Sequence, residues 1–234
     1  MTLWNRKFSF IFKFNRIYKM LKIKVKASDI TSLTDARYFA AKEVEWLSFN
    51  FTEGVVGYIQ PMKARAIFEW VEGVTIVGEF NNMTGDEINF YTEGWSLKAI
   101  QVGHFTPIDE ILKIKNVPII KEIVIEEFTN PEFLRKELLP FAPFVEAFQL
   151  SFDKNNISWD TLKNSDSMIT VEDLKTICDE FKIILSIDFQ QDMLDEILEL
   201  NLYGLNLKGG EEERVGVKSF DELDDILDAL EVED

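Results

Sequence analysis

Eight short apolar segments that alternate with segments of helical spacing predict a single (β/α)8 TIM barrel of the α/β class. The chain has 234 residues, the usual length of such a barrel, and 46% of them are hydrophobic, enough for one substantial core. Two small domains fit this pattern less well. We therefore expect residues 20–234 to form one barrel.

The first repeating unit lies between residues 21 and 51. Residues 21–27 alternate apolar and cationic side chains, which is the period of two that is typical of a strand. Ser32 or Thr34 then caps a helix that ends by residue 42 or 43. Residues 46–51 form a short aromatic run that suits a buried strand, and two strands joined through a helix lie parallel.

The same alternation continues to the end of the chain. Pro61 and Pro131 stand in first helical turns, Thr84 is a candidate N-cap, and Pro140 ends a helix. The later strands are predicted at 74–80, 97–102, 117–124, 145–150, 183–187 and 203–207. The later helices are predicted at 60–71, 86–92, 107–113, 131–138, 171–181, 192–200 and 220–230.

Charge and cysteine content limit the partners and the compartment. Lys and Arg number 25 against 42 Asp and Glu, which gives a formal charge of −17. Such an acidic surface repels nucleic acid and anionic membranes, so we expect neither as a partner. The single cysteine, Cys178, lies in the apolar pattern of a helix, so we interpret it as a core residue of a cytoplasmic protein.

Residues 1–19 differ from the rest of the chain because they contain five cationic and no acidic residues. Their longest apolar run, residues 8–12, is too short to span a membrane and is interrupted by Ser9. We predict that this segment is not part of the fold and that Met20 is the natural start. A basic amphipathic membrane anchor is the alternative.

Several segments resemble one enzyme family. K-A-S-D-I-T at 26–31, D-A at 35–36 and L-S-F-N-F at 47–51 are similar to the K-V-C-G-I-T, D-A and G-F-x-F motifs of phosphoribosylanthranilate isomerase, an enzyme of tryptophan biosynthesis. G-Y-I-Q-P at 57–61 and V-G-E-F-N-N at 77–82 resemble further motifs of that family. The resemblance spans residues 22–230 and implies a barrel that isomerises N-(5-phosphoribosyl)anthranilate by an Amadori rearrangement.

The resemblance places serines at both catalytic positions. Ser28 stands where the family has its cysteine base, and Ser151 stands where it has its aspartate acid. A serine hydroxyl without a neighbouring base is a poor proton acceptor, and it is no acid. Asp29 and Asp153 lie within two residues of these positions and are candidates for displaced catalytic groups. The alternative for both is helix capping or loop hydrogen bonding.

Position selects the candidate ligand-binding residues, because the active site of such a barrel lies at the carboxyl ends of its strands. The candidates are Asn50, Gln101, Asp188, Lys208, Gly209 and Gly210. The family binds phosphate through glycine-rich loops after strands seven and eight. Asp188 replaces a glycine there and repels an anion, so we expect any phosphate at 208–210. The alternative is an ordinary Gly-Gly turn.

Other positions weaken the likeness to an active isomerase. Gly57 stands where the family has the arginine that holds the substrate carboxylate, and we interpret His104, the single histidine, as a solvated loop residue. The sequence contains no His and Cys cluster with metal-ligand spacing, so we expect no metal and no cofactor.

Three hypotheses follow for the function. The first is a divergent phosphoribosylanthranilate isomerase-like barrel, impaired or inactive in the isomerisation, that keeps a pocket for a small molecule, with a phosphate-bearing one among the candidates. The second is an active isomerase with displaced acid and base residues. The third is a non-enzymatic interaction module. The sequence leaves the oligomeric state open.

Overall fold

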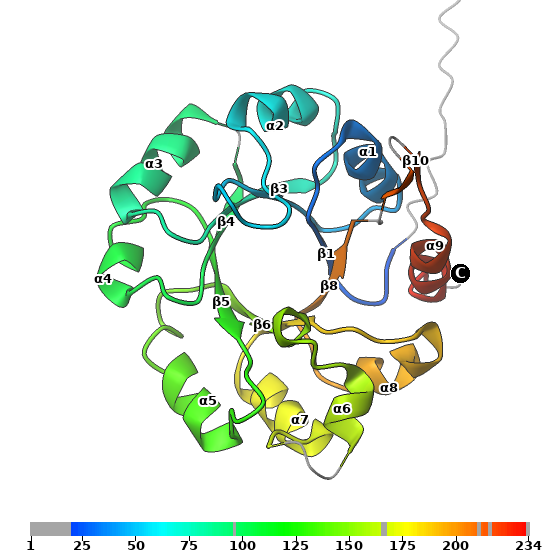
Figure 1. The fold of residues 1–234 in the computed structure, drawn as a ribbon. Coiled ribbons are helices and arrows are strands. Elements are labelled where there is room, and N and C mark those ends of the chain that lie inside the picture. Colours follow the sequence, from blue (N-terminus) through cyan, green and yellow to red (C-terminus); the bar gives the residue numbers. More distant parts are fainter. Residues whose placement is uncertain (1–19, 96, 165–167, 210–211, 215–216, 233–234) are drawn as a thin grey trace, which may run out of the picture.

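Eight parallel strands close into a barrel that helices surround, in the sequence order β1 to β8 (Figure 1). The computed structural model describes residues 20–95, 97–164, 168–209, 212–214 and 217–232. Strand β8 pairs with β1 and closes the barrel, with Lys26 opposite Asn206 and Ser28 opposite Lys208. The structure therefore confirms the predicted (β/α)8 fold. Within these residues, no helix is long and apolar enough to cross a membrane.

The predicted elements are found in their predicted order. The barrel strands are β1 (Val25–Ser28), β2 (Trp46–Asn50), β3 (Thr75–Phe80), β4 (Ala99–Val102), β5 (Ile119–Val124), β6 (Ala147–Ser151), β7 (Ile183–Ser186) and β8 (Gly204–Lys208). The helices that follow them are α1 (Leu33–Ala41), α2 (Pro61–Phe68), α3 (Gly85–Gly94), α4 (Ile108–Ile111), α5 (Pro131–Leu138), α7 (Val171–Glu180), α8 (Leu194–Leu198) and α9 (Asp221–Ala229).

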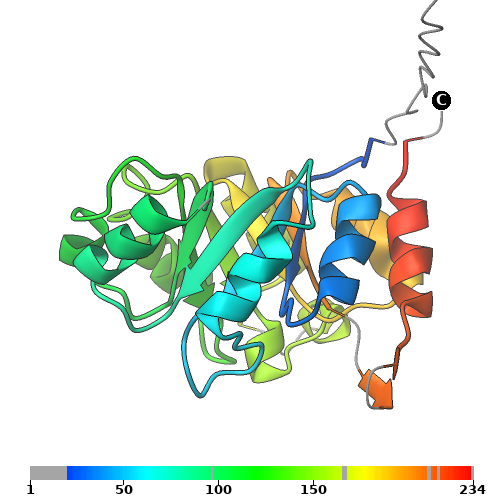
Figure 2. The same cartoon turned by 90° about the horizontal axis from the view of Figure 1, so that it is seen from above.

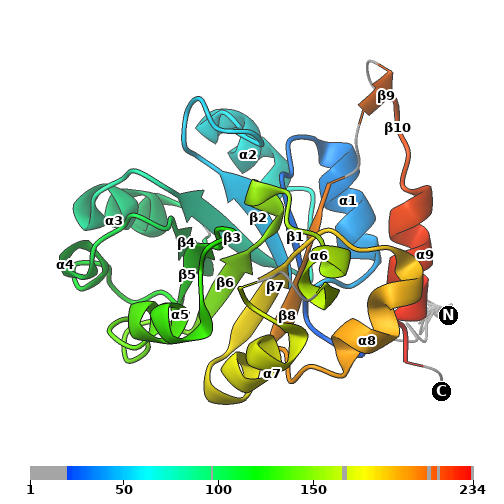
Figure 3. The same cartoon turned by 60° about the horizontal axis from the view of Figure 1, so that its bottom comes forward.

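The structure also contains elements that the sequence did not predict. A short helix, α6 (Trp159–Lys163), follows β6, and Ser158 caps it by accepting from the Thr161 N–H. Strands β9 (Glu212–Arg214) and β10 (Val217–Lys218) form a small antiparallel sheet that projects from the barrel beside α9 (Figure 3). These elements lie in the connections after β6 and after β8, at the same end of the barrel.

The first predicted strand is shorter than its alternating pattern. Its N-terminal half turns away to meet the other end of the described chain, where the segment before β1 runs near the end of α9 (Figure 2). Leu21 forms an antiparallel bridge with Glu231, and the Lys22 N–H donates to the Leu230 carbonyl at 2.7 Å. Residues 21 and 22 therefore belong to this terminal pairing, and contact with the barrel begins at Lys24, whose carbonyl accepts from the Leu205 N–H at 2.9 Å.

Helix caps fall where side-chain chemistry predicts them. Ser32, not Thr34, caps α1, and its hydroxyl accepts from the Asp35 N–H at 3.1 Å. Thr84 caps α3 in a capping box with Glu87, which satisfies two backbone donors of the first turn.

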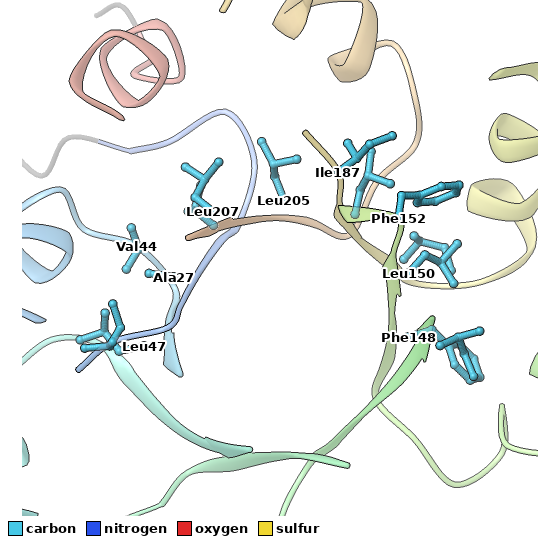
Figure 4. Close-up of a cluster of buried hydrophobic side chains, with 14 of the residues drawn as sticks. Ala27, Val44, Leu47, Phe148, Leu150, Phe152, Ile187, Leu205 and Leu207 are labelled. Atoms are coloured by element: carbon cyan, nitrogen blue, oxygen red, sulfur yellow. The ribbon is translucent and has the colours of Figure 1, made fainter. Parts of the chain in front are cut away.

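Apolar side chains form two separate cores. The larger lies between the strands and the helices, and its side chains point away from the barrel axis (Figure 4). It contains the predicted core residues Phe49, Phe51, Ile100, Phe148 and Leu185, and also Cys178, whose thiol pKa burial raises to about 12. The smaller core fills one layer inside the barrel and consists of Trp46, Val77, Ala99, Ile120, Ala147 and Ile184. Residues 1–19, predicted to lie outside the fold, fall outside the described residues.

Candidate functional site

A second layer inside the barrel is polar, and every strand contributes one side chain to it. Because side chains alternate across a strand, residues next to the outer core point inward. These inward side chains belong to residues that are at most 7% exposed. They are Lys26, Ser48, Glu79, Gln101, Glu122, Gln149, Ser186 and Asn206.

An ion pair crosses this layer from β1 to β3. Lys26 Nζ lies 2.6 Å from Glu79 Oε1 and also donates to Asn206 Oδ1 at 3.3 Å. Burial alone raises the pKa of Glu79, but the charge and hydrogen bond of Lys26 outweigh it, so this pKa lies below its ordinary value. The barrel therefore holds an ionised carboxylate at its centre.

Ser151 belongs to a second network, between β5 and β6. Its hydroxyl donates to Glu122 Oε1 at 2.8 Å and accepts from Gln149 Nε2 at 3.1 Å. Glu122 Oε1 also pairs with Lys154 Nζ at 2.5 Å. The hydroxyl proton of Ser151 is thus directed at a carboxylate that an ammonium already neutralises.

Ser28 ends β1 at the mouth of the barrel. Its hydroxyl accepts from Asn206 Nδ2 at 3.1 Å, and the same amide nitrogen donates to Ser186 Oγ at 3.0 Å. A side-chain amide is a donor here and takes no proton from a hydroxyl. Ser28 therefore has a hydrogen-bonding role rather than an activated nucleophilic one.

Asp29 follows Ser28 in a left-handed backbone conformation, with φ of 57°. Burial, together with the negative charge of Glu79, raises the pKa of Asp29, although Lys208 and Lys26 act in the opposite direction. Its carboxyl group also lies against Gly57. A Cβ atom at Gly57 would stand 2.3 Å from Asp29 Oδ1 and 3.2 Å from Asp29 Cα, so a larger residue at 57 requires the Asp29 carboxylate to move.

Asp153 and Lys208 form an ion pair at the same mouth. Asp153 Oδ2 lies 2.6 Å from Lys208 Nζ, and the Asp153 side chain is only 4% exposed. Its other oxygen, Oδ1, is buried and has no hydrogen-bond partner among the described residues. Burial alone lowers the pKa of Lys208, but Asp153, Asp188 and Asp29 outweigh it and raise this pKa.

A cavity of about 720 Å³ opens between β7, β8 and α9. Asp153, Asp188 and Lys208 line it, together with the acidic first turn of α9. Its remaining wall is partly apolar and includes Phe189, Leu207, Leu223 and Ile226. This size suits a small molecule.

The structure brings together only some of the predicted site residues. Lys208 and Asp188 line this cavity with Asp153, and the Gly209 N–H donates to the Ser28 carbonyl at 2.9 Å. Gln101 is buried in the polar layer, with Oε1 unpartnered among the described residues. Gly210 lies outside the described residues.

Two further residues have anchoring contacts. Asn50 holds the loop after β2, since it accepts from the Thr52 N–H at 2.9 Å and donates to the Val56 carbonyl. His104 is partly buried rather than fully solvated, because Nδ1 accepts from the Val124 N–H and lies 3.5 Å from Glu137 Oε1.

Sequence reasoning missed the charged residues inside the barrel, namely Lys26, Glu79 and Glu122. A signal was present for Lys26, which alternates with apolar residues in a predicted parallel strand. Both faces of such a strand are buried in a barrel, so a charged residue at the alternate position points into the lumen rather than to solvent.

Fold and site together define a (β/α)8 barrel with a polar interior and a cavity of about 720 Å³ at the carboxyl ends of its strands. Solved structures of phosphoribosylanthranilate isomerases are similar to it. The enzyme from Thermus thermophilus has 25% identity and a TM-score of 0.69, with 89% of this chain and 98% of that chain covered. The enzyme from Thermotoga maritima has 20% identity and a TM-score of 0.70, with 88% and 97% covered.

A further isomerase structure of this kind, at 22% identity and a TM-score of 0.67, covers 88% of this chain and 96% of its own and holds reduced 1-(o-carboxyphenylamino)-1-deoxyribulose 5-phosphate. No family model and no curated protein sequence matches the chain. The structural neighbours support the resemblance seen in the sequence motifs.

Proposed function

We propose that this protein is a phosphoribosylanthranilate isomerase-like barrel that binds a small molecule at its mouth and is impaired or inactive in the Amadori isomerisation. The observation that carries the proposal is the hydrogen bonding of two hydroxyls. Ser28 accepts from an amide, and Ser151 donates to a carboxylate that is paired with an ammonium. Neither group performs the proton transfers that the reaction requires at these positions.

Retention of a ligand site is supported by the cavity between β7, β8 and α9 and by the polar lumen beside it. Unpartnered polar atoms among the described residues lie in the lumen and at its mouth, including Gln101 Oε1, Gln149 Oε1 and Asp153 Oδ1. Buried polar atoms normally have partners, so their presence favours bound water or a ligand over a filled core. These unpartnered atoms therefore favour a protein that binds a small molecule over a non-enzymatic interaction module.

The proposal places the protein among the pseudoenzymes of a tryptophan-biosynthesis family. We also propose a cytoplasmic location, which is supported by the buried Cys178 thiol, because this cysteine forms no disulfide.

An isomerase assay tests the proposal. The substrate N-(5-phosphoribosyl)anthranilate is generated in situ, and its loss is followed with this protein and with the Thermus thermophilus enzyme in parallel. Loss of an acid and a base, each worth about 10²- to 10⁴-fold, predicts a rate at least about 10⁴-fold lower than that of the comparison enzyme. The protein should also fail to rescue a tryptophan auxotroph. Turnover within tenfold of the comparison enzyme contradicts the proposal.

A second candidate function is an isomerase with displaced groups, and the raised pKa of the Asp29 carboxyl favours it. A carboxyl group that keeps its proton at higher pH suits a general acid, and Asp153 at the same mouth is available as a base. Under this alternative, Asp29→Asn and Asp153→Asn each abolish a measurable isomerase rate. Under the first proposal, neither substitution changes the residual rate.

A further inference from the structure

We infer that the short turn after β6, η1 (Asp153–Asn155), is an autoinhibitory plug that closes the polar layer of the lumen, and that this layer opens to a ligand when the Lys154 side chain swings out. The inference rests on the proposed small-molecule site at the barrel mouth and specifies how access to the deeper part of that site is controlled.

Side chains of this turn are tied to strands on both sides of the mouth. Asp153 Oδ2 lies 2.6 Å from Nζ of Lys208, the last residue of β8. Asn155 Nδ2 donates at 2.7 Å to the carbonyl of Ile125, which directly follows β5. Because β6 and β7 lie between β5 and β8 in the barrel, the turn extends across the ends of these two strands.

Lys154, the middle residue of the turn, reaches down into the lumen. Its ammonium lies 2.5 Å from Glu122 Oε1, and the Lys154 and Glu122 side chains are 43% and 2% exposed. The stem of Lys154 therefore runs from solvent to a buried carboxylate. Such a carboxylate needs a partner, and Lys154 supplies one from the chain itself instead of from a ligand.

The plug separates the cavity from the greater part of the polar layer. Two residues of this layer, Ser186 and Asn206, line the cavity between β7, β8 and α9, whereas Glu122 and Gln149 do not. On the covered side, Gln149 Oε1 and Gln101 Oε1 are buried without a hydrogen-bond partner among the described residues. A ligand that carries donors gains these bonds once the layer is open, so opening extends the site inward from the cavity.

The plug can open while the barrel stays folded. The two lysines that close it, Lys154 and Lys208, have side chains that are 43% and 46% exposed, and solvent weakens such ion pairs. The base of the turn is held independently of them. Phe152 and Ile157 are buried, the Phe152 N–H donates to the Ser186 carbonyl at 2.8 Å, and the Ile157 N–H donates to the Phe152 carbonyl at 3.1 Å. The closing side chains are therefore the weakly held part of the turn.

Thiol accessibility in the full chain tests the inference. Gln149→Cys places a thiol in the covered layer, while the native Cys178, 3% exposed in the outer core, reports any general loosening of the same molecule. Modification of each site by iodoacetamide is followed by peptide mass spectrometry. With Lys154 in place, both thiols should react slowly. Adding Lys154→Ala should raise the rate at position 149 by at least about tenfold, the worth of one charge-assisted hydrogen bond, and leave the rate at Cys178 unchanged.

Lys163→Ala provides a matched control. Lys163 on α6 has a side chain that is also 43% exposed and pairs with Glu196 on α8 at 2.9 Å, away from the lumen. Loss of this pair should leave the rate at position 149 unchanged. Gln101→Cys on β4 is a second probe of the same layer, since Gln101 is 2% exposed, and it keeps the test decisive if Gln149→Cys does not fold.

Three outcomes overturn the inference. One is rapid modification of the introduced thiol with Lys154 in place, because the layer is then open already. Another is an unchanged rate at that thiol in the Lys154→Ala background. The third is an equal rise at the introduced thiol and at Cys178, which shows general destabilisation instead of local opening. Each of these leaves the proposed isomerase defect untouched, since that is read from turnover of the anthranilate substrate.

Discussion

Removal of one partner from the buried Lys26–Glu79 ion pair should cost a large part of the stability of the barrel. The two side chains are 0% and 9% exposed and their charged atoms are 2.6 Å apart. In Lys26→Met, the Glu79 carboxylate stays in the lumen without its ammonium and out of reach of bulk water. Breaking a buried pair in this way costs about 3–5 kcal/mol, against a total stability of about 5–15 kcal/mol for a typical domain.

A surface ion pair of equal length provides the control. Lys182 Nζ lies 2.6 Å from Glu146 Oε1, but these side chains are 55% and 43% exposed. Solvent screens such a pair, so Lys182→Met should cost at most about 1 kcal/mol. Urea denaturation followed by tryptophan fluorescence measures both variants. Equal losses for Lys26→Met and Lys182→Met would refute the argument from burial.

The same ion pair predicts a pH dependence. The pKa of Glu79 is lower in the folded chain than its ordinary value of 4.5. Its contribution to stability is therefore complete above pH 4.5 and is lost as the pH falls through the lowered pKa. Glu79→Gln should flatten this acid side of the stability curve, although it lowers the stability at pH 7. An unchanged acid slope would contradict the assignment.

Four further predictions concern the mouth and the N-terminus. The double substitution Ser28→Cys with Ser151→Asp should raise isomerase activity above that of the unmodified chain, and no gain in the anthranilate assay would count against the assigned positions. The unmodified chain should lose stability as the pH rises from 3.8 through the raised pKa of Asp29, and Asp29→Asn should reduce this loss. Asparagine has no carboxyl group to ionise in this buried place, and it tolerates the positive φ. Parallel urea titrations of both proteins at pH 4 and pH 7 check this prediction. Asp188→Gly should strengthen the binding of inorganic phosphate at the mouth, and weaker or unchanged binding in calorimetry would contradict the charge argument. A chain without residues 1–19 should melt like the full chain, and a midpoint lower by several degrees would show that the segment docks.

Most of the fold was predictable because local patterns and global closure agree. Alternating segments of the right length allow few architectures, and side-chain caps such as those of Ser32 and Thr84 fix helix starts. The exceptions depend on distant partners. Leu21 continues the alternation of β1 but bridges to Glu231, a pairing that no local pattern indicates. Helix α6 has five residues, too few for a helical period to stand out.

The site was less predictable, because its chemistry depends on which side chains meet across the lumen. The rule that strand ends carry function found Asp188 and Lys208, which do line one cavity. It did not find Lys26 and Glu79, which lie within strands rather than after them and pair between β1 and β3. Lys26 and Glu79 meet because the barrel closes with a particular strand register. Neither the closure nor the register can be read from a local stretch of sequence.

The contact between Asp29 and Gly57 constrains the order in which this barrel can change. Gly57 stands where the resemblance places an arginine, and any side chain there would begin 2.3 Å from the Asp29 carboxylate. Position 57 also has a φ of 77°, which disfavours residues other than glycine. A single substitution to arginine therefore needs the Asp29 carboxylate to rotate away and also strains the backbone at position 57. Residues 29 and 57 are therefore coupled, and a substitution at position 57 should cost less stability in an Asp29→Gly background than in the unmodified chain.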